Sequence, residues 1–189
     1  NRSGIVISEG CVTVVLERAD RARARGARIL AEASGFGAAA DGTNPLILDS
    51  QGQALGRAID AALRDAAVSP GEIDHIQAHG VSLEMYDHCE TSAFKTVFGD
   101  HAYRIPISGI KSMTGQAYAA GGLLGAAAAL MALHEGVVPP TINLDDPDPF
   151  CDLAFVPNRY RVNDVGAALV VSLSFGGTYS AAVFKRAGA

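Results

Sequence analysis

The stretch KSMTGQ at positions 111–116 and the shorter stretch AHG at 78–80 are the most informative parts of this chain. Each follows a short apolar run that predicts a strand, so His79 and Lys111 are both expected near the end of a strand. In a sheet flanked by helices, ligands bind beyond the carboxyl ends of the strands. We therefore expect these two stretches to converge on one site with the turn that contains Phe175.

The composition is that of a chain that can bury a sizeable core. Its 189 residues are 49% hydrophobic and 19% charged, with 21 Gly and no Trp, which is typical of α/β structure. A net charge of −5 gives no reason to expect nucleic acid as a partner. Cys11, Cys89 and Cys151 lie far apart without a CxxC pair, so we expect a reduced, cytoplasmic protein and no disulfide framework.

Two features bear on the limits of the chain and on membranes. The chain opens without Met or a signal peptide, so we expect it to be a fragment or a processed piece of a longer protein. The apolar stretch 119–133 carries no charge but is shorter than the ~20 residues that a membrane span needs. We expect it to form a helix that is buried on all sides rather than a membrane segment.

Hydrophobic patterns predict strands that alternate with helices, and hence a largely parallel sheet with helices on its faces. Strands are expected at 5–7, 12–16, 29–37, 73–78, 104–108, 167–173 and 179–184, the first two as a hairpin or as neighbours. Helices are expected at 17–28, after an S-x-x-Q capping box at 50–53, at 84–98 and from 114 to 136.

A series of stretches together resembles the C-terminal half of a β-ketoacyl-[acyl carrier protein] synthase, or ketosynthase. In chain order they are GIVISEG at 4–10, IQAHG at 76–80, Asp87 with Glu90, KSMTG at 111–115, PPTIN at 139–143 with Asp145, DLAFVP at 152–157 and FGGT at 175–178. Each stretch is weak alone, but their number, order and spacing cover nearly the whole chain. The resemblance implies the thiolase fold, an α/β architecture of five αβαβα layers built from two similar halves.

The same resemblance implies a division of the chain. Residues 1–28 would supply the last strands of the N-terminal half with a connecting helix, and residues 29–189 would form the C-terminal half. The nucleophilic cysteine of the family lies in the first half, and none of the three cysteines here stands in its motif. We therefore expect a companion polypeptide, or an N-terminal piece of the same protein, to carry the nucleophile.

The resemblance also implies roles for individual residues. Ketosynthases decarboxylate a malonyl thioester to an enolate, whose oxygen is stabilised by two imidazole N–H groups in the manner of an oxyanion hole. His79 matches the first imidazole, with a structural histidine as the alternative. Lys111 and Glu90 match residues that organise the family's active site, with a structural ion pair as the alternative. Phe175 matches the family's gate, where its N–H contributes to the thioester oxyanion hole.

The chain departs from the family at several of these positions. Gln116 stands where the second histidine belongs, and a glutamine amide donates a hydrogen bond but cannot shuttle a proton near pH 7. Val81 and Leu83 replace two threonines that bind the phosphopantetheine arm, and neither can form those hydrogen bonds. At the gate, Ser174 replaces a glycine and the bulky Tyr179 replaces an asparagine.

These departures resemble those of chain-length factors, which are ketosynthase-like subunits that pair with an active ketosynthase in type II polyketide systems. Three functions stay open. The chain belongs to such a subunit, impaired in condensation and shaping the acyl tunnel of a heterodimer; or to a competent synthase that uses His79 with Gln116; or to a scaffold without acyl chemistry. The resemblance implies an acyl carrier protein as a partner that delivers phosphopantetheine, and no cofactor, metal, nucleic acid or membrane.

Three other patterns have weaker chemical interpretations. GFGAAA at 35–40 has the GxGxxA form of a dinucleotide site, but a loop follows it where a helix is required. His75 and His79, four residues apart on a strand, lie about 13 Å apart, which is too far to share a metal ion. The arginines between 18 and 28 could dock an acidic carrier protein, although a solvated helix face is the more ordinary interpretation.

Overall fold

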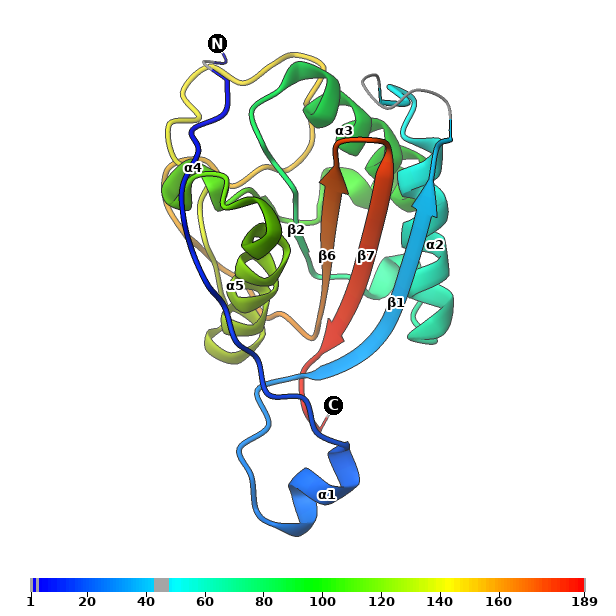
Figure 1. Ribbon diagram of the computed structural model, residues 1–189, viewed down its shortest axis with the longest axis vertical. Helices are drawn as coiled ribbons and strands as arrows, with labels where there is room; N and C mark the ends of the chain where they lie inside the picture. The colour runs from blue at the N-terminus through cyan, green and yellow to red at the C-terminus, as the bar shows by residue number, and fades with distance from the viewer. Residues whose placement is uncertain (1, 3, 43–47, 189) are drawn as a thin grey trace.

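The computed structural model describes residues 2, 4–42 and 48–188, and its centre is a mixed sheet in the order β1-β7-β6-β2-β3 (Figure 1). The strands of this sheet are β1 (Glu32–Ala40), β2 (His75–Gln77), β3 (Ile107–Ser108), β6 (Ala167–Ser174) and β7 (Thr178–Lys185). A separate antiparallel pair joins β4 (Val137–Val138) to β5 (Arg161–Val162).

Helices cover both faces of this sheet. Helices α2 (Gln53–Asp65) and α3 (Glu84–Phe98) lie on one face and α5 (Gly121–Glu135) lies on the other (Figure 1). Two shorter helices are α1 (Ala19–Ala24) and α4 (Lys111–Thr114), and 3₁₀ turns cover Pro70–Glu72, Gly99–Tyr103 and Tyr118–Ala120. The result is a three-layered α/β structure, as the sequence predicts.

The sheet is largely parallel, as expected, except that β7 is reversed. β2 runs parallel to β3 and to β6, whereas β7 runs antiparallel to both β6 and β1. The turn between β6 and β7 explains the difference, because Gly176 and Gly177 both have positive φ, at 90° and 68°. Such a turn reverses the chain at once into a hairpin, whereas a parallel pair needs a long crossover connection.

The two strands expected at 5–7 and 12–16 are absent from the described structure. Residues 4–16 run alongside α5 (Figure 1), and their one ladder contact among the described residues is an isolated bridge between Ile7 and Gln116. Val6 and Val15 are 73% and 87% exposed. β-Branched side chains favour extended backbone, but a strand also needs a neighbour to accept and donate its hydrogen bonds.

The helix expected from 114 to 136 is divided in two. Gly115 has a φ of +72°, and Gln116 then turns its backbone toward the N-terminal segment, donating its N–H to Val6 O (2.8 Å) and accepting from Ser8 N (3.1 Å). The main helix α5 begins only at Gly121. It is not buried on all sides, since Leu123 and Met131 are 41% and 51% exposed. None of the helices in the described part of the chain has the length and apolar character that a membrane crossing requires.

The GFGAAA stretch is a packing surface. It lies inside β1, and a Cβ atom at Gly37 would sit 2.1 Å from the carbonyl oxygen of Ala58 in α2. The same atom at Gly35 would sit 2.3 Å from the carbonyl oxygen of Ala62. Both distances are far below ordinary van der Waals contact, so the glycines let the strand and helix backbones touch. The described residues that follow the stretch directly, 41 and 42, are not helical, as a dinucleotide site would require.

We expect Gly37→Ala to destabilise the protein by about 3 kcal/mol, because backbone atoms of α2 cannot move aside as a flexible side chain can. The matched control is Gly56→Ala within α2, where an added Cβ would meet only Val97 Cγ2 at 3.7 Å. That change should be neutral or stabilise by up to about 1 kcal/mol through helix propensity. Urea unfolding of the full-length protein measures both, and similar midpoints for the two variants would contradict the packing argument.

Buried His75 gives a second prediction, on pH. Its Nδ1 is hydrogen-bonded to Pro106 O (3.0 Å), its Nε2 has no partner among the described residues, and burial lowers its pKa to about 4. Between pH 6.5 and 4 this histidine is protonated in the unfolded chain but stays neutral in the folded chain. His75 therefore lowers the free energy of unfolding as the pH falls. The slope of this contribution reaches about 1.4 kcal/mol per pH unit.

We therefore expect His75→Asn to flatten the pH dependence of the unfolding free energy below pH 6.5 by about that slope. Above pH 7 the curves for the variant and the parent should run parallel, separated by whatever uniform cost the substitution carries. Urea titrations from pH 4.5 to 8 provide the measurement. Curves that stay parallel throughout would show that His75 is not held neutral by its surroundings.

Candidate functional site

The candidate site is built on the turn that follows β2. His79 is 4% exposed, and its N–H donates to Glu90 Oε1 at 2.6 Å. The next residue, Gly80, has a φ of +49° and donates its N–H to Glu90 Oε2 at 2.8 Å. The backbone at the end of the strand is thus held by both oxygens of one carboxylate.

Glu90 reaches this turn because of its position on α3. It shares the buried stripe of the helix with Tyr86, Cys89, Ala93 and Phe94, at the spacing that places residues on one helical face. Burial raises the pKa of Glu90, and the hydrogen bonds from Gly80 and His79 oppose that rise because they stabilise the charged form. A buried carboxylate is tolerable here because two backbone donors satisfy it.

Lys111 holds the same turn from the other side. It begins α4, and its Nζ donates to the carbonyl oxygen of His79 at 2.5 Å and lies 3.4 Å from His79 Nδ1. Burial lowers the pKa of Lys111, and the charge of Glu90 raises it. Glu90 and Lys111 therefore hold the backbone of His79 at its N–H and at its carbonyl oxygen, and no direct ion pair joins the two among the described contacts.

These contacts define the tautomer of the His79 ring. Nδ1 receives the N–H of Leu173 at 3.3 Å and faces the Lys111 ammonium, so it is an acceptor. Burial, and then the charge of Lys111, lower the pKa of His79 to about 3, and the ring is neutral at pH 7. A neutral ring with an acceptor at Nδ1 carries its proton on Nε2, which makes Nε2–H a fixed hydrogen-bond donor.

Gln116 lies beside His79 at the wall of the same cleft. Its backbone is fixed by the N-terminal segment, and the residue is 7% exposed. The amide oxygen of its side chain is buried without a hydrogen-bond partner among the described residues. Its amide group is therefore not committed to holding the fold.

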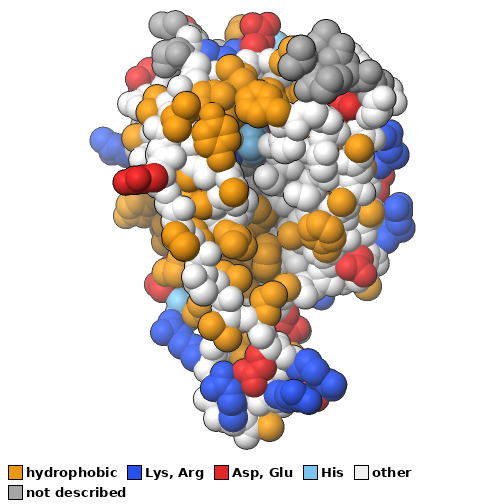
Figure 2. Space-filling model, viewed as in Figure 1, with side chains coloured by type: hydrophobic (Ala, Val, Ile, Leu, Met, Phe, Trp, Pro, Cys, Tyr) orange, Lys and Arg blue, Asp and Glu red, His pale blue; other side chains and the backbone are white. Residues whose placement is uncertain are grey.

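The cleft has a volume of about 570 Å³ and lies between α5 and the strands. His79, Gln116, Phe175, Val81 and Leu83 all line it, so the structure brings together five of the seven residues expected at the site. Figure 2 shows hydrophobic side chains gathered around a hollow on this face. Glu90 and Lys111 lie behind the turn and line a second cavity of about 450 Å³, which Gln116 also borders.

The gate contains an aromatic contact that the sequence analysis missed. The Tyr86 ring stacks on the His79 ring at 5.9 Å between centroids and meets the Phe175 ring edge-on at 5.8 Å. Phe175 itself is 60% exposed at the β6–β7 turn. The only signal for Tyr86 in the sequence is an aromatic residue at the start of α3, and aromatic residues on a buried helical face are ordinary core residues.

Tyr179 is not among the described residues that line the cleft, although the sequence places it at the gate. Side chains alternate along β7, and Tyr179 falls on the face away from the cleft, whereas Ser180 and Ala182 line it. The Tyr179 ring is fully buried, and its hydroxyl donates to Asp41 Oδ2 at 2.8 Å. The bulk of this side chain therefore fills the core and leaves the cleft unobstructed.

The arginine-rich segment lies away from the site. Helix α1 stands at the opposite end of the molecule from the β6–β7 turn (Figure 1). Arg18, Arg23 and Arg25 pair with Asp20, Glu32 and Glu17, all on the same part of the chain. This placement favours a solvated helix face over a docking site for a carrier protein that delivers substrate to the cleft.

Comparison with known proteins is consistent with this geometry. The family described as "Beta-ketoacyl synthase, C-terminal domain" matches residues 30–145. The chain is 40% identical to 3-oxoacyl-[acyl-carrier-protein] synthase 2 of Coxiella burnetii, with 98% of this chain and 45% of that protein covered. It is 42% identical to the tetracenomycin polyketide synthase ketoacyl synthase alpha subunit of Streptomyces glaucescens, with 98% and 44% covered. The chain thus spans less than half the length of these relatives.

Solved structures share the fold along nearly the whole chain. A type II polyketide synthase acyl carrier protein in complex with its ketosynthase bound to the hexaketide gives a TM-score of 0.96 at 39% identity, covering 98% of this chain and 45% of that one. The ishigamide ketosynthase/chain length factor gives 0.95 at 38% identity, covering 100% and 46%. The expected thiolase-like fold is confirmed, and by sequence and by structure the chain belongs to the β-ketoacyl synthase family.

Proposed function

We propose that this chain is the C-terminal part of a ketosynthase-like subunit of polyketide or fatty-acid biosynthesis, of the chain-length-factor type. In this role it shapes the acyl tunnel of an active ketosynthase and is itself impaired in decarboxylative Claisen condensation. The observation that carries the proposal is Gln116, a residue without a titratable proton, in the cleft that His79 lines.

The two cleft donors differ in what they can do. The Nε2–H of His79 is fixed and neutral, and it can stabilise the oxygen of an enolate or a thioester. Gln116 can add one more N–H, but it cannot give or take a proton near neutral pH. Proton transfer by a positioned side chain typically contributes about 10² to 10⁴ in rate, so an exchange of histidine for glutamine is expected to weaken condensation severely.

The entrance of the cleft supports the same proposal. Val81 is 4% exposed and Leu83 is partly buried, and both present apolar side chains to the cleft. A phosphopantetheine arm would find no hydroxyl at either position. We propose that the arm arrives on an acyl carrier protein, that the chain has no cofactor of its own, and that the arm is used mainly by the partner subunit. A cytoplasmic location stays a prediction.

A companion half is part of the proposal. Three large apolar residues that line the cleft are exposed: Phe36 of β1 by 60%, Tyr118 of the 3₁₀ turn before α5 by 53%, and Leu123 of α5 by 41%. Apolar patches of this kind mark surfaces that another element covers. We propose that this element is the N-terminal ketosynthase half, and that the assembled subunit forms a heterodimer with an active ketosynthase.

The alternative function is a competent β-ketoacyl synthase that condenses acyl and malonyl thioesters with His79 and Gln116. One observation favours it: Gln116 borders the cleft, and its amide oxygen has no hydrogen-bond partner among the described residues that would hold the side chain in place. The two curated relatives described above are also both named as synthases. Glutamine would then act as the second oxyanion donor.

Intact-protein mass spectrometry distinguishes the two functions. The purified complex is incubated with an acyl carrier protein thioester, and the mass of every polypeptide is followed. Acyl mass only on a separate ketosynthase supports the chain-length-factor role. Acyl mass on the polypeptide that contains this chain, or on its own N-terminal part, would overturn that role and establish the competent synthase.

Substitutions at Gln116 provide the corresponding prediction. In the full-length complex, Gln116→Leu removes the amide at similar volume, and we expect condensation to stay within about twofold of the parent. A competent synthase would instead lose about 10²-fold, because an oxyanion donor disappears. His79→Ala is the control for a donor on the same wall. Rates are measured with malonyl and acyl carrier protein thioesters under single-turnover conditions.

A further inference from the structure

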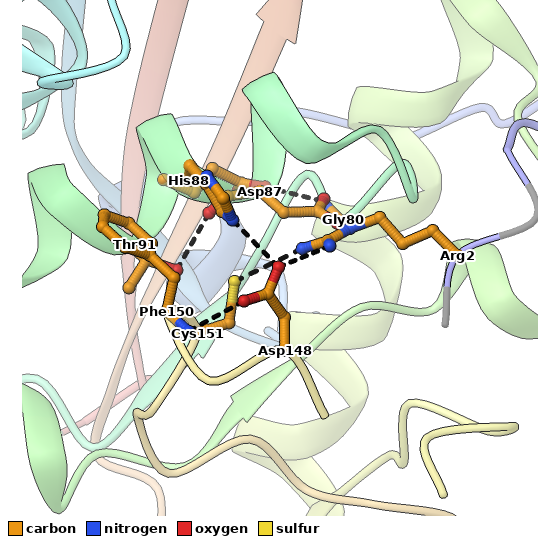
Figure 3. A network of polar contacts seen from close by, with 9 residues as sticks. Arg2, Gly80, Asp87, His88, Thr91, Asp148, Phe150 and Cys151 are labelled. Carbon is orange, nitrogen blue, oxygen red and sulfur yellow. Dashed lines mark hydrogen bonds and ion pairs between the residues drawn. The ribbon is translucent and has the colours of Figure 1, made fainter. Parts of the chain in front are cut away.

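A polar network outside the cleft joins three distant parts of the chain. Arg2 donates from Nε to Asp87 Oδ2 at 2.8 Å and from Nη1 to Asp148 Oδ2 at 2.5 Å (Figure 3). Its Nη2 lies 3.6 Å from Cys151 Sγ. The side chains of Arg2, Asp87 and Asp148 are only 19–23% exposed, so these charged groups are largely withdrawn from water.

The guanidinium occupies the place that a metal ion would need. His88, Asp148 and Cys151 have ligand atoms close enough to share an ion, and His88 Nε2 lies 2.9 Å from Asp148 Oδ2. Arg2 already contacts both Asp148 and Cys151. A second cation at about 4 Å from it would be repelled by about 4 kcal/mol at an effective dielectric constant near 20. Arg2 is therefore the cation of this cluster, and its partners fix its position.

One arm of the network reaches the turn at His79. Asp87 lies one helical turn before Glu90 on α3, on the same side of the helix. The charged groups that face Glu90 are Asp87 from α3, which raises the pKa of Glu90, and Lys111 from α4, which lowers it. Burial raises the pKa of Asp87 and the Arg2 contact lowers it, so Arg2 favours the charged form of a carboxylate beside Glu90.

The other arm reaches the segment that carries Lys111. Asp148 accepts from the N–H of Phe150 at 2.8 Å as well as from Arg2, and so closes the end of the loop 139–151. The start of that loop is bonded to the Lys111 segment: Thr141 Oγ1 accepts the N–H of Gly109, and Ser112 Oγ accepts the N–H of Ile142, both at 2.9 Å. Arg2, Asp87, Glu90, Lys111 and Asp148 line one cavity of about 450 Å³.

We propose that Arg2 is a positioning residue that holds both sides of the candidate site. Through Asp87 it supports the turn that Glu90 holds, and through Asp148 it supports the Lys111 segment. The effect of Arg2 on turnover rests on the proposed function. The geometry that Arg2 holds does not depend on that function. A measurement of local structure therefore tests the role of Arg2 separately from the proposed function.

Hydrogen exchange in the full-length protein provides that test. Exchange rates, divided by their intrinsic values at each pH, are followed in peptides that cover 75–83 and 139–152. In Arg2→Gln we expect about tenfold faster exchange in both peptides and parent rates in peptides from α2. In Arg2→Lys a single ammonium group replaces the guanidinium that contacts two carboxylates. Protection from exchange should therefore be recovered in one of the two peptides at most. Arg18→Gln removes an exposed arginine and is the matched control, with parent rates throughout.

A pH series separates this role from a merely structural brace. Arg2→Gln leaves Asp87 beside Glu90 without its cation, so the two carboxyls bind their first proton at a higher pH. As the pH is lowered, the His79 and Gly80 amides should therefore lose their protection from exchange at a higher pH than in the parent. Asp87→Asn removes the charge that raises the pKa of Glu90, so protection should persist to lower pH than in the parent. Opposite shifts support the proposal.

Two results would overturn it: parent exchange in both peptides of Arg2→Gln, or shifts of the same sign in Arg2→Gln and Asp87→Asn. Where Arg2→Gln does not fold, Arg2→Lys and Asp148→Asn carry the test. Asp148→Asn should speed exchange in 139–152 and leave 75–83 at the parent rate. Condensation assays on the same variants bear on the proposed function alone.

Discussion

The carboxylate of Glu90, buried beneath the turn after β2, is the interaction on which the rest of the site depends. Removing a carboxylate from water costs several kcal/mol unless hydrogen bonds replace its hydration. Here the donors are the N–H groups of His79 and Gly80, at 2.6 and 2.8 Å. Because the strand ends at this point, those N–H groups have no partners in a neighbouring strand. The carboxylate accepts their hydrogen bonds, and they in turn replace its hydration. Lys111 completes the arrangement through the carbonyl oxygen of His79.

This arrangement fixes the chemistry of the His79 ring through its backbone. With the backbone held from two sides, the ring can accept the N–H of Leu173 at Nδ1 and carry its proton at Nε2. Burial excludes the imidazolium form. The site therefore gains a donor of fixed direction that does not change with pH across the neutral range, which is how a preorganised oxyanion donor works.

The sequence predicts local features well and long-range ones poorly. The bounds of α3 and the end of α5 at Gly136 follow from patterns within a few residues. His79, Gln116 and Phe175 meet in one cleft because the motifs encode strand ends. The direction of β7 depends on two glycine conformations, and the strands expected at 5–16 depend on partners that the pattern does not contain. The Arg2 contacts cross 85 and 146 residues, and no periodicity signals them. The face on which Tyr179 lies follows from its alternation with Ser180 along β7.

Gln116 gives the cleft a side chain that can donate a hydrogen bond but cannot transfer a proton near neutral pH. Of the described side chains that line the cleft, His79 alone has an ordinary pKa near neutrality, and burial holds it neutral. The charges of Glu90 and Lys111 lie behind the turn, where they hold backbone and do not reach the cleft as proton carriers. A cleft of this kind can polarise a carbonyl group through N–H donors, but none of the described side chains that line it is suited to carry a proton near neutral pH. Under the proposed function, such a cleft recognises and orients an acyl chain, and the active ketosynthase of the heterodimer supplies the proton transfers.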